Sequence, residues 1–216
     1  MNKNTVRKNY DRLAPLYDLI FSRIFDDARK KSISKMNIKP NDRIIEIGVG
    51  TGVSLKHFNF SNNLSFTGID LSEKMLEKAQ HKADKYQNSN ITLDCINGED
   101  TPYNNSTFDK VILMYVYSVT PNPEKLIEES IRICKDNGSI YIINHFSNSK
   151  NNNLNIFEKI LSNWSDVIGF RSDFSYANHI ERYNLTIESV ISANLFSITK
   201  IIHFKKNKNT HILKQK

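Results

Sequence analysis

Residues 44–52, "IIEIGVGTG", place three glycines at alternate positions directly after an apolar run that contains one carboxylate, Glu46. The whole chain has seven glycines, so three within five residues indicate a local requirement. Glycine has no Cβ and therefore lets the backbone approach a ligand closely. No Lys-Ser/Thr pair follows, which excludes a P-loop, and the third glycine comes two residues after the second, which breaks the dinucleotide spacing. Gly48, Gly50 and Gly52 are thus candidates for contact with another kind of ligand.

A second candidate, Asp70, ends the next apolar run in "GIDLS", about 20 residues after the loop. An acid at that place accepts hydrogen bonds from both hydroxyls of a ribose. Each acid also has a simpler interpretation, since Glu46 could cap the turn and Asp70 could cap a helix that begins near Ser72. The combination at this spacing favours a cofactor site.

The elements that position these residues follow from hydrophobic periodicity. Short apolar runs predict strands at residues 43–48, 64–70, 91–96, 109–116 and 139–145. Helical spacing predicts helices over residues 72–86 and 123–134. Strands that alternate with helices imply right-handed crossovers, so we expect an α/β doubly wound fold with a mostly parallel sheet.

Two segments lie outside this pattern. Residues 1–36 carry apolar residues at helical spacing with basic neighbours, which predicts an amphipathic helical arm interrupted near Pro15. Residues 147–182 form an insertion on the substrate side of the sheet. After it we expect a helix over 186–195 and two strands, over 197–204 and 211–214, that form an antiparallel edge hairpin. The chain divides into an arm or lid (1–38) and a main domain (39–216).

The net charge of +7 has two interpretations. It favours an anionic partner such as nucleic acid, an anionic membrane surface or an acidic metabolite. Alternatively it reflects solubility plus a basic tail, because residues 205–216 hold five lysines and no acid. No apolar run approaches the roughly 18 residues of a membrane span, and no signal peptide is expected. Cys95 and Cys134 lie in apolar sequence, which predicts buried thiols in a reducing cytoplasm.

Four stretches in order, "EIGVGTG", "GIDLSEKMLEKAQ", "INGEDTPYNNSTFD" and "ICKDNGSIYIINH", resemble the motifs of class I S-adenosylmethionine-dependent methyltransferases. The resemblance runs from about residue 42 to the C-terminus and implies a Rossmann-like seven-stranded sheet. It also implies that the three loop glycines line the methionine part of the cofactor, with Glu46 near its amino group and Asp70 on the ribose. Around the adenine it places Leu71, Met75, Asn97 and Gly98. Asn97 stands where many relatives have an Asp, and Glu99, which follows in register, could be solvent-exposed.

The resemblance extends to bacterial soluble-type phosphatidylethanolamine N-methyltransferases. It is carried by "YDRLAPLYDLIFSRIFDDARKKSI", "YVYSVTPNPEKLI", "NHF" and "IGFRSDF", which occur in the right order. It implies N-methylation of phosphatidylethanolamine and its monomethyl and dimethyl derivatives toward phosphatidylcholine. The Tyr-Asp arm is shared with quinone-pathway C-methyltransferases, so a small soluble acceptor, a quinone precursor or an amine, stays an alternative.

The chemistry of amine methylation suggests further roles. Aromatic faces hold the charge that moves from sulfur to nitrogen, and the candidates are Tyr10, Tyr17, Tyr115 and, on the substrate side, Tyr117. The amine must be neutral to attack, and His145 could accept its proton. Arg171 could bind the lipid phosphate through its fork of donors. Simpler interpretations remain: the arm tyrosines could only pack, His145 could be structural, and Arg171 could pair with a nearby acid.

A lipid substrate also gives the arm a role, either as an interfacial helix on anionic lipid or as a lid over the pocket. We therefore expect a cytoplasmic protein that associates peripherally with the inner membrane and uses a phospholipid substrate. We expect no metal, no obligate protein partner and no nucleic acid, because the basic residues cluster at the arm and the tail.

Overall fold

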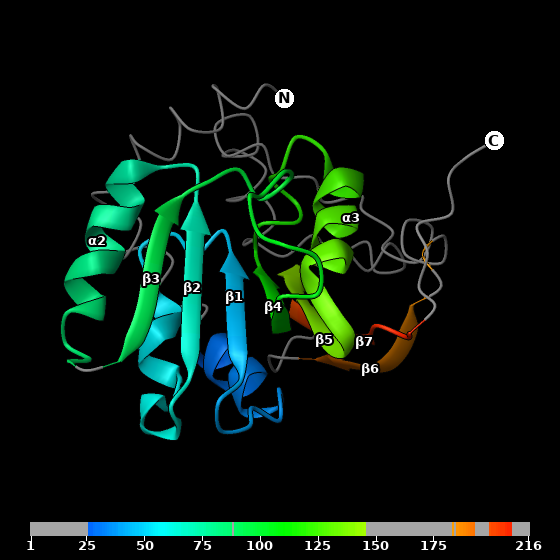
Figure 1. Ribbon diagram of the computed structural model, residues 1–216, viewed down its shortest axis with the longest axis horizontal. Helices are drawn as coiled ribbons and strands as arrows, with labels where there is room; N and C mark the ends of the chain where they lie inside the picture. Colours follow the sequence, from blue (N-terminus) through cyan, green and yellow to red (C-terminus); the bar gives the residue numbers. More distant parts are fainter. Residues whose placement is uncertain (1–25, 88, 146–182, 184, 193–198, 209–216) are drawn as a thin grey trace, which may run out of the picture.

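The computed structural model describes residues 26–87, 89–145, 183, 185–192 and 199–208. In this part of the chain, seven strands form one sheet in the order β3-β2-β1-β4-β5-β7-β6 (Figure 1). The strands are β1 (Arg43–Ile47), β2 (Ser65–Asp70), β3 (Asn90–Cys95), β4 (Phe108–Met114), β5 (Cys134–His145), β6 (Thr186–Ser192) and β7 (Thr199–Lys205). Strands β1 to β5 run parallel, and β7 is antiparallel to both β5 and β6. The expected seven-stranded, mostly parallel sheet with an antiparallel C-terminal edge is confirmed.

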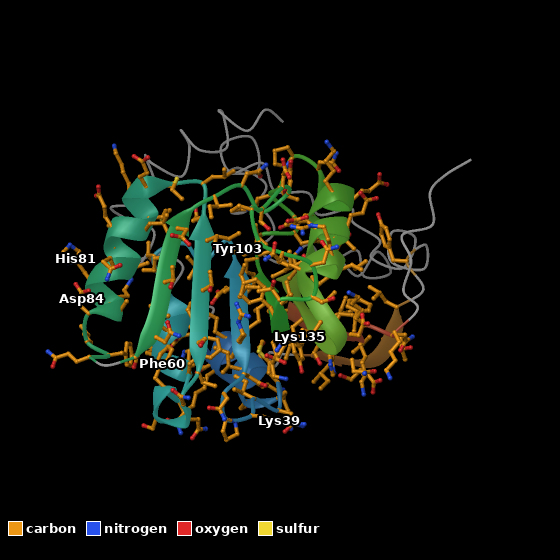
Figure 2. The ribbon with its side chains drawn as sticks, in the orientation of Figure 1. Lys39, Phe60, His81, Asp84, Tyr103 and Lys135 are labelled. Atoms are coloured by element: carbon orange, nitrogen blue, oxygen red, sulfur yellow. The ribbon has the colours of Figure 1, made fainter. Side chains whose placement is uncertain are left out.

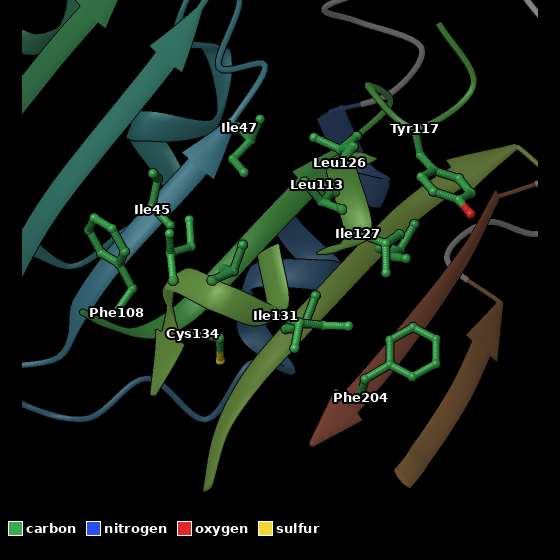
Figure 3. Packing of buried hydrophobic residues seen from close by; sticks show 14 of the residues in the cluster. Ile45, Ile47, Phe108, Leu113, Tyr117, Leu126, Ile127, Ile131, Cys134 and Phe204 are labelled. Carbon is green, nitrogen blue, oxygen red and sulfur yellow. The ribbon is translucent and has the colours of Figure 1, made fainter. Parts of the chain in front are cut away.

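Both faces of the sheet are covered because alternate residues of the central strands are apolar on both sides. On one face, Ile45 and Leu113 pack with Ile127 of helix α3 (Pro123–Ile133), as Figure 3 shows. On the other face, Ile44 packs in a cluster with Met36. That cluster also includes residues of η1 (Val53–His57), of helix α2 (Glu73–Ala83) and of the helical residues 26–34. A strand buried on both faces reads as a continuous apolar run, which is why these strands were predictable.

Local sequence sets where the two long helices begin. Ser72 accepts a hydrogen bond from the Met75 N–H at 3.2 Å, and Asn122 accepts one from the Lys125 N–H at 3.0 Å. Each is an N-cap whose side chain satisfies an amide that the helix leaves unpaired. Pro123 follows Asn122 at the first helical position, where its missing N–H costs nothing. The cap at Ser72 directly follows Asp70 and Leu71, and therefore fixes the end of β2 beside the start of α2.

The prediction for residues 186–195 was wrong. Ile187, Val190 and Ile191 have helical spacing, but residues 186–192 form strand β6, which pairs with β7 through a register shift between Ile187 and Ser189. The segment is rich in β-branched residues, and pairing with a neighbouring strand outweighs the spacing. The antiparallel hairpin is therefore made by β6 and β7, and the predicted strand at 211–214 lies outside the described residues.

The predicted arm is described only from residue 26, and this part packs on the main domain. Asp26 accepts hydrogen bonds from Lys56 Nζ at 2.7 Å and pairs with His57 Nε2 at 2.8 Å, both on η1. The Tyr141 hydroxyl donates to the Met36 carbonyl at 2.9 Å. Residues 26–36 thus share the core of the sheet. None of the described helices has the length and apolarity needed to span a bilayer.

Both cysteines are free thiols. Cys134 is buried as expected, whereas the expectation for Cys95 was wrong, because this residue ends the outer strand β3 and is exposed.

Candidate functional site

A cleft of about 760 Å³, a volume that includes space open to solvent, lies at the carboxyl ends of the central strands. Here β1 lies between β2 and β4, so the chain order reverses, which is the place where open α/β folds bind ligands. One wall, which we call the β4 wall, begins at the last residue of β4 and consists of Met114, Tyr115, Val116, Val119, Thr120 and Pro121. The rest of the lining is Ile47, Gly48, Gly50, Ile69, Asp70, Leu71, Ser72, Met75, Ile96, Asn97, Gly98, Glu99 and Leu126.

The glycine loop has the backbone that its composition predicts. Gly48, Gly50 and Gly52 have φ of 76°, 56° and 71°, in the left-handed region that favours glycine. A Cβ at Gly48 would lie 2.7 Å from the Val116 Cβ, so the loop and the β4 wall meet there. A Cβ at Gly50 would meet no protein atom within 4 Å, which leaves open space beside a residue of the cleft.

The third glycine has a different role from the one that the resemblance implies. Gly52 does not line the cleft, and a Cβ there would lie 3.0 Å from the backbone of Ala79 in α2. Its small size therefore serves the packing of the loop on α2. Gly52 is followed by the five-residue 3-10 helix η1.

Asp70 is oriented by the main chain. Its Oδ2 accepts a hydrogen bond from the Gly50 N–H and its Oδ1 accepts one from the Ser72 N–H, both at 2.9 Å. A carboxylate accepts about four hydrogen bonds in all. Asp70 therefore ties the glycine loop to the start of α2 and presents oriented acceptor oxygens at the cleft. The alternative role as the helix cap is wrong, because Ser72 is the N-cap of α2, and the bond from the Ser72 N–H to Asp70 instead closes the turn before it.

The residues predicted around the adenine also reach the cleft. Leu71, Met75, Asn97 and Gly98 all line it. Met75 is buried, whereas Leu71 is partly exposed. The Asn97 Oδ1 accepts a hydrogen bond from the Glu99 N–H at 3.2 Å, which closes a turn. Glu99, for which solvent exposure was considered, is only 7% exposed and lines the cleft as well.

Glu46 lies beneath the glycine loop and is not part of the cleft lining. It is 2% exposed, and its Oε2 accepts a hydrogen bond from the Ser54 hydroxyl at 2.6 Å. Burial raises the pKa of the Glu46 carboxyl to about 7, although the Ser54 hydrogen bond and the charge of Arg29 act in the opposite direction. The structure thus gives Glu46 a role in joining β1 to η1. Its predicted contact with an amino group stays a prediction.

The raised pKa predicts a pH-dependent stability that Glu46→Gln removes. Between pH 4.5 and about 7 the unfolded carboxyl loses its proton while the folded one keeps it, so the free energy of unfolding of the native protein falls as pH rises through this window. At about 1.4 kcal/mol for each pKa unit, the full loss relative to Glu46→Gln is on the order of 3 kcal/mol. Thermal unfolding of both proteins between pH 5 and pH 8 measures it, and a constant difference across that range contradicts it.

Tyr115 and Arg29 meet at the β4 wall. Tyr115 lines the cleft and has a φ of 60°, a strained conformation for an aromatic residue that often marks a functional site. The Arg29 Cζ lies 5.2 Å from the centroid of the Tyr115 ring. Arg29 is only 6% exposed, and its Nη1 is buried without a hydrogen-bond partner among the described residues. Sequence reasoning missed Arg29, because one arginine in a basic helical segment resembles a solvated charge.

Of the remaining candidates, Tyr117 lies away from the cleft, and the side chains of the others fall outside what the structure describes. Tyr117 was predicted to bind substrate, but its side chain is fully buried in the core against α3 and is absent from the cleft lining. It follows Tyr115 by two residues in a turn, so the two side chains enter different clusters. His145 ends β5, opposite Thr199 of β7, and its side chain lies outside what the structure describes. Tyr10, Tyr17 and Arg171 lie outside the described residues.

An adenosine-containing ligand fits the cleft that these residues form. Asp70 presents oriented acceptors for two neighbouring hydroxyls, and the apolar side chains of Leu71, Met75 and Ile96 provide surface for a flat ring. Arg29 is not part of the cleft lining, but its buried guanidinium packs against the ring of Tyr115, which is, and its Nη1 has no partner among the described residues, so it would favour an anionic group that reached it. In the described residues no cluster of His, Cys, Asp and Glu suits a metal ion.

Comparison with known proteins gives consistent results. Residues 45–142 match the methyltransferase domain family. The chain is 32% identical over 176 residues to a phosphatidylethanolamine N-methyltransferase of Cereibacter sphaeroides, covering 81% of this chain and 84% of that protein. It is 27% identical over 141 residues to a demethylmenaquinone methyltransferase of Tropheryma whipplei, covering 63% of this chain and 57% of that protein.

Among solved structures, phosphoethanolamine N-methyltransferase 2 of Haemonchus contortus in complex with S-adenosyl-L-methionine superposes with a TM-score of 0.72. The alignment covers 92% of this chain and 57% of that one at 14% identity. At this identity the likeness shows the fold.

Proposed function

The chain belongs to the class I S-adenosylmethionine-dependent methyltransferases, and we propose that it methylates the amino head group of phosphatidylethanolamine. The reaction would proceed through the monomethyl and dimethyl forms toward phosphatidylcholine. S-adenosylmethionine is the cofactor, and when bound it supplies a methyl group activated on a sulfonium. The observation that carries the proposal is the 32% identity to a phosphatidylethanolamine N-methyltransferase over more than four fifths of both chains.

On the cofactor side, Asp70 would hold the ribose hydroxyls, while Leu71, Met75, Asn97 and Gly98 would surround the adenine. Arg29 lies close enough to Glu46 for its charge to lower the pKa of that carboxyl, against the larger effect of burial. An amino acid carries both an anionic carboxylate and a cationic ammonium. We assign the carboxylate of the methionine part to Arg29, whose Nη1 lacks a partner among the described residues.

On the acceptor side, Tyr115 is the aromatic residue that the described cleft offers. The guanidinium of Arg29 lies over one face of its ring, so the acceptor's developing charge would be held by the part of the ring that Arg29 leaves uncovered. The β4 wall is otherwise largely apolar and would exclude water, which favours a neutral amine over an ammonium. His145 would accept the proton of the amine, Tyr10 and Tyr17 would complete the aromatic surface, and Arg171 would bind the phosphate of the lipid.

The membrane part of the proposal depends on charge and on the arm. A protein with a net charge of +7 is attracted to the anionic inner leaflet, where each nearby basic residue adds about 1 kcal/mol. Residues 26–36 pack in the core, so the amphipathic pattern that suits an interfacial helix is that of residues 1–25. The protein would therefore act in the cytoplasm, bound peripherally to the inner membrane.

A second candidate is methylation of a quinone precursor, which the similarity to demethylmenaquinone methyltransferase favours. That similarity is lower, at 27% identity, and extends over 63% of this chain. An acceptor of this kind is methylated on a carbon atom and contains no reacting amine.

The acceptor is tested by release of S-adenosylhomocysteine from purified protein and S-adenosylmethionine. Vesicles of phosphatidylethanolamine with an anionic phospholipid are compared with vesicles of phosphatidylcholine with the same anionic phospholipid, with soluble phosphoethanolamine and with a demethylated quinone. We expect turnover only with the phosphatidylethanolamine vesicles, and none with the Asp70→Ala variant. Turnover with the quinone or the soluble amine alone would contradict the proposal.

A further inference from the structure

Glu99 belongs to the turn that carries the predicted adenine contacts. Residues 97–100 follow β3, and the Asp100 N–H donates to the Asn97 carbonyl at 3.1 Å while the Glu99 N–H donates to the Asn97 Oδ1. Asn97, Gly98 and Glu99 all line the cleft. Any displacement of this turn therefore displaces the Glu99 side chain as well.

The Glu99 carboxylate reaches across to the other wall. Its Oε1 accepts a hydrogen bond from the Thr120 hydroxyl at 2.8 Å and another from the Asn122 N–H at 2.9 Å. Thr120 is part of the β4 wall, and Asn122 is the N-cap of α3. A carboxylate is also favoured electrostatically at a helix N-terminus. One buried oxygen thus joins the cofactor turn to the end of the β4 wall.

A second carboxylate joins the same two parts of the chain away from the cleft. Glu129 of α3 accepts hydrogen bonds from the Thr101 N–H, at 2.8 Å, and from the Thr101 hydroxyl. Arg132 donates to Glu129 and to the carbonyls of Thr101 and Tyr103. Neither Thr101 nor Glu129 lines the cleft. The protein therefore contains two similar Thr–Glu bridges, one inside the cleft and one outside it.

We propose that Glu99 is a positioning residue that couples the two walls, so that a nucleoside bound at residues 97–99 holds Thr120 and the start of α3 in place. The same bond orders the β4 wall, including Tyr115, before the acceptor arrives. The Thr101–Glu129 bridge only fastens α3 to the segment that follows the turn at residues 97–100. The effect on methyl transfer rests on the proposed function, which supplies the acceptor. The ordering of the β4 wall by the cofactor can be measured without any acceptor.

Amide hydrogen exchange with S-adenosylhomocysteine tests the coupling. In the native protein we expect saturating S-adenosylhomocysteine to slow exchange of residues 119–126 by about tenfold, a factor typical of coupling between sites. Glu99→Ala should abolish this effect while exchange at residues 48–52 is still slowed. Glu99→Gln should preserve it, since an amide oxygen accepts the same two bonds. Thr120→Val, which keeps the carboxylate and the Asn122 bond, should reduce it.

Thr101→Val is the matched control, because it removes an equivalent hydroxyl from the outer bridge. It should lower the melting temperature about as much as Thr120→Val and leave the slowed exchange at residues 119–126 intact. Equal loss of the effect in the two threonine variants, or full retention in Glu99→Ala, would overturn the proposal.

With phosphatidylethanolamine vesicles, Glu99→Ala should lower kcat by about tenfold or more, as displaced reacting groups do. The dissociation constant of the cofactor should change by less than about threefold, because the turn keeps its other bonds. Failure of the native protein to methylate the lipid would remove the proposed acceptor but leave the exchange result to decide the coupling.

Discussion

Replacing Asp70 with alanine is expected to weaken S-adenosylmethionine binding by about 100-fold and to remove measurable methyl transfer. Hydrogen bonds to a charged group contribute about 1.5–3 kcal/mol each, so the loss of two bonds to the ribose at the low end of this range gives about 100-fold. The substitution also removes the acceptor of the Gly50 and Ser72 N–H groups, which in the native protein both donate hydrogen bonds to Asp70 at 2.9 Å. Isothermal titration calorimetry with S-adenosylhomocysteine measures the affinity directly.

Asp84→Ala is the matched control for this experiment. Asp84 caps the far end of α2 (Figure 2), where it accepts a hydrogen bond from Gln80 at the protein surface, and it does not line the cleft. Its loss should leave the affinity for cofactor unchanged. An Asp70→Ala protein that binds S-adenosylhomocysteine as tightly as the Asp84→Ala protein would contradict the ribose assignment.

Replacing Arg29 with methionine is expected to weaken cofactor binding by about 10- to 100-fold without lowering the stability of the ligand-free protein. A buried cation whose Nη1 has no partner among the described residues costs free energy in the absence of ligand, so an apolar side chain of similar length should be neutral or stabilising. With ligand present, the same substitution removes a charge-assisted bond. A binding role predicts a lower affinity for the cofactor with unchanged or higher stability of the ligand-free protein. A purely structural role predicts lower stability with unchanged affinity.

Melting temperatures with and without S-adenosylhomocysteine measure both effects. For Arg29→Met we expect an unchanged or higher melting temperature without ligand and a smaller increase on ligand addition. Arg43→Met is a useful control, since Arg43 also lies over an aromatic ring, that of Phe108, but is exposed at the start of β1. A lower melting temperature of Arg29→Met with unchanged affinity would show that Arg29 only packs the helical residues 26–34 on Tyr115.

The fold was predictable where strands are buried on both faces. β1 and β4 contain short apolar runs, and Gly48 follows β1 directly. The edge of the sheet was less predictable, because β6 is half exposed, with Ile187 47% and Val190 44% exposed, and its sequence also fits a helix. Its strand conformation depends on pairing with β7, a contact between chain segments that local periodicity does not encode.

In the candidate site too, residues whose positions follow from local sequence were predictable, and residues whose positions depend on contacts between distant segments were not. Gly48, Gly50 and Asp70 were predicted to lie together because a strand that turns tightly into the next element needs these residue types at this spacing, and all three line one cleft. Arg29 and Glu99 were not, since their roles depend on burial and on partners far away in the chain, Glu46 in one case and Thr120 in the other. Tyr117 was misplaced because a turn after β4 sends it into the core while Tyr115 faces the cleft.

The central claim is that the amino head group of phosphatidylethanolamine receives the methyl group. Purified protein would be incubated with S-adenosylmethionine carrying a deuterated methyl group and with vesicles of phosphatidylethanolamine and an anionic phospholipid. Mass spectrometry of the head-group fragment then locates the label. We predict one, two or three labelled methyl groups on the head-group nitrogen. An unlabelled head group, from protein that binds S-adenosylhomocysteine normally, would contradict the claim and direct the search to quinone precursors and soluble amines.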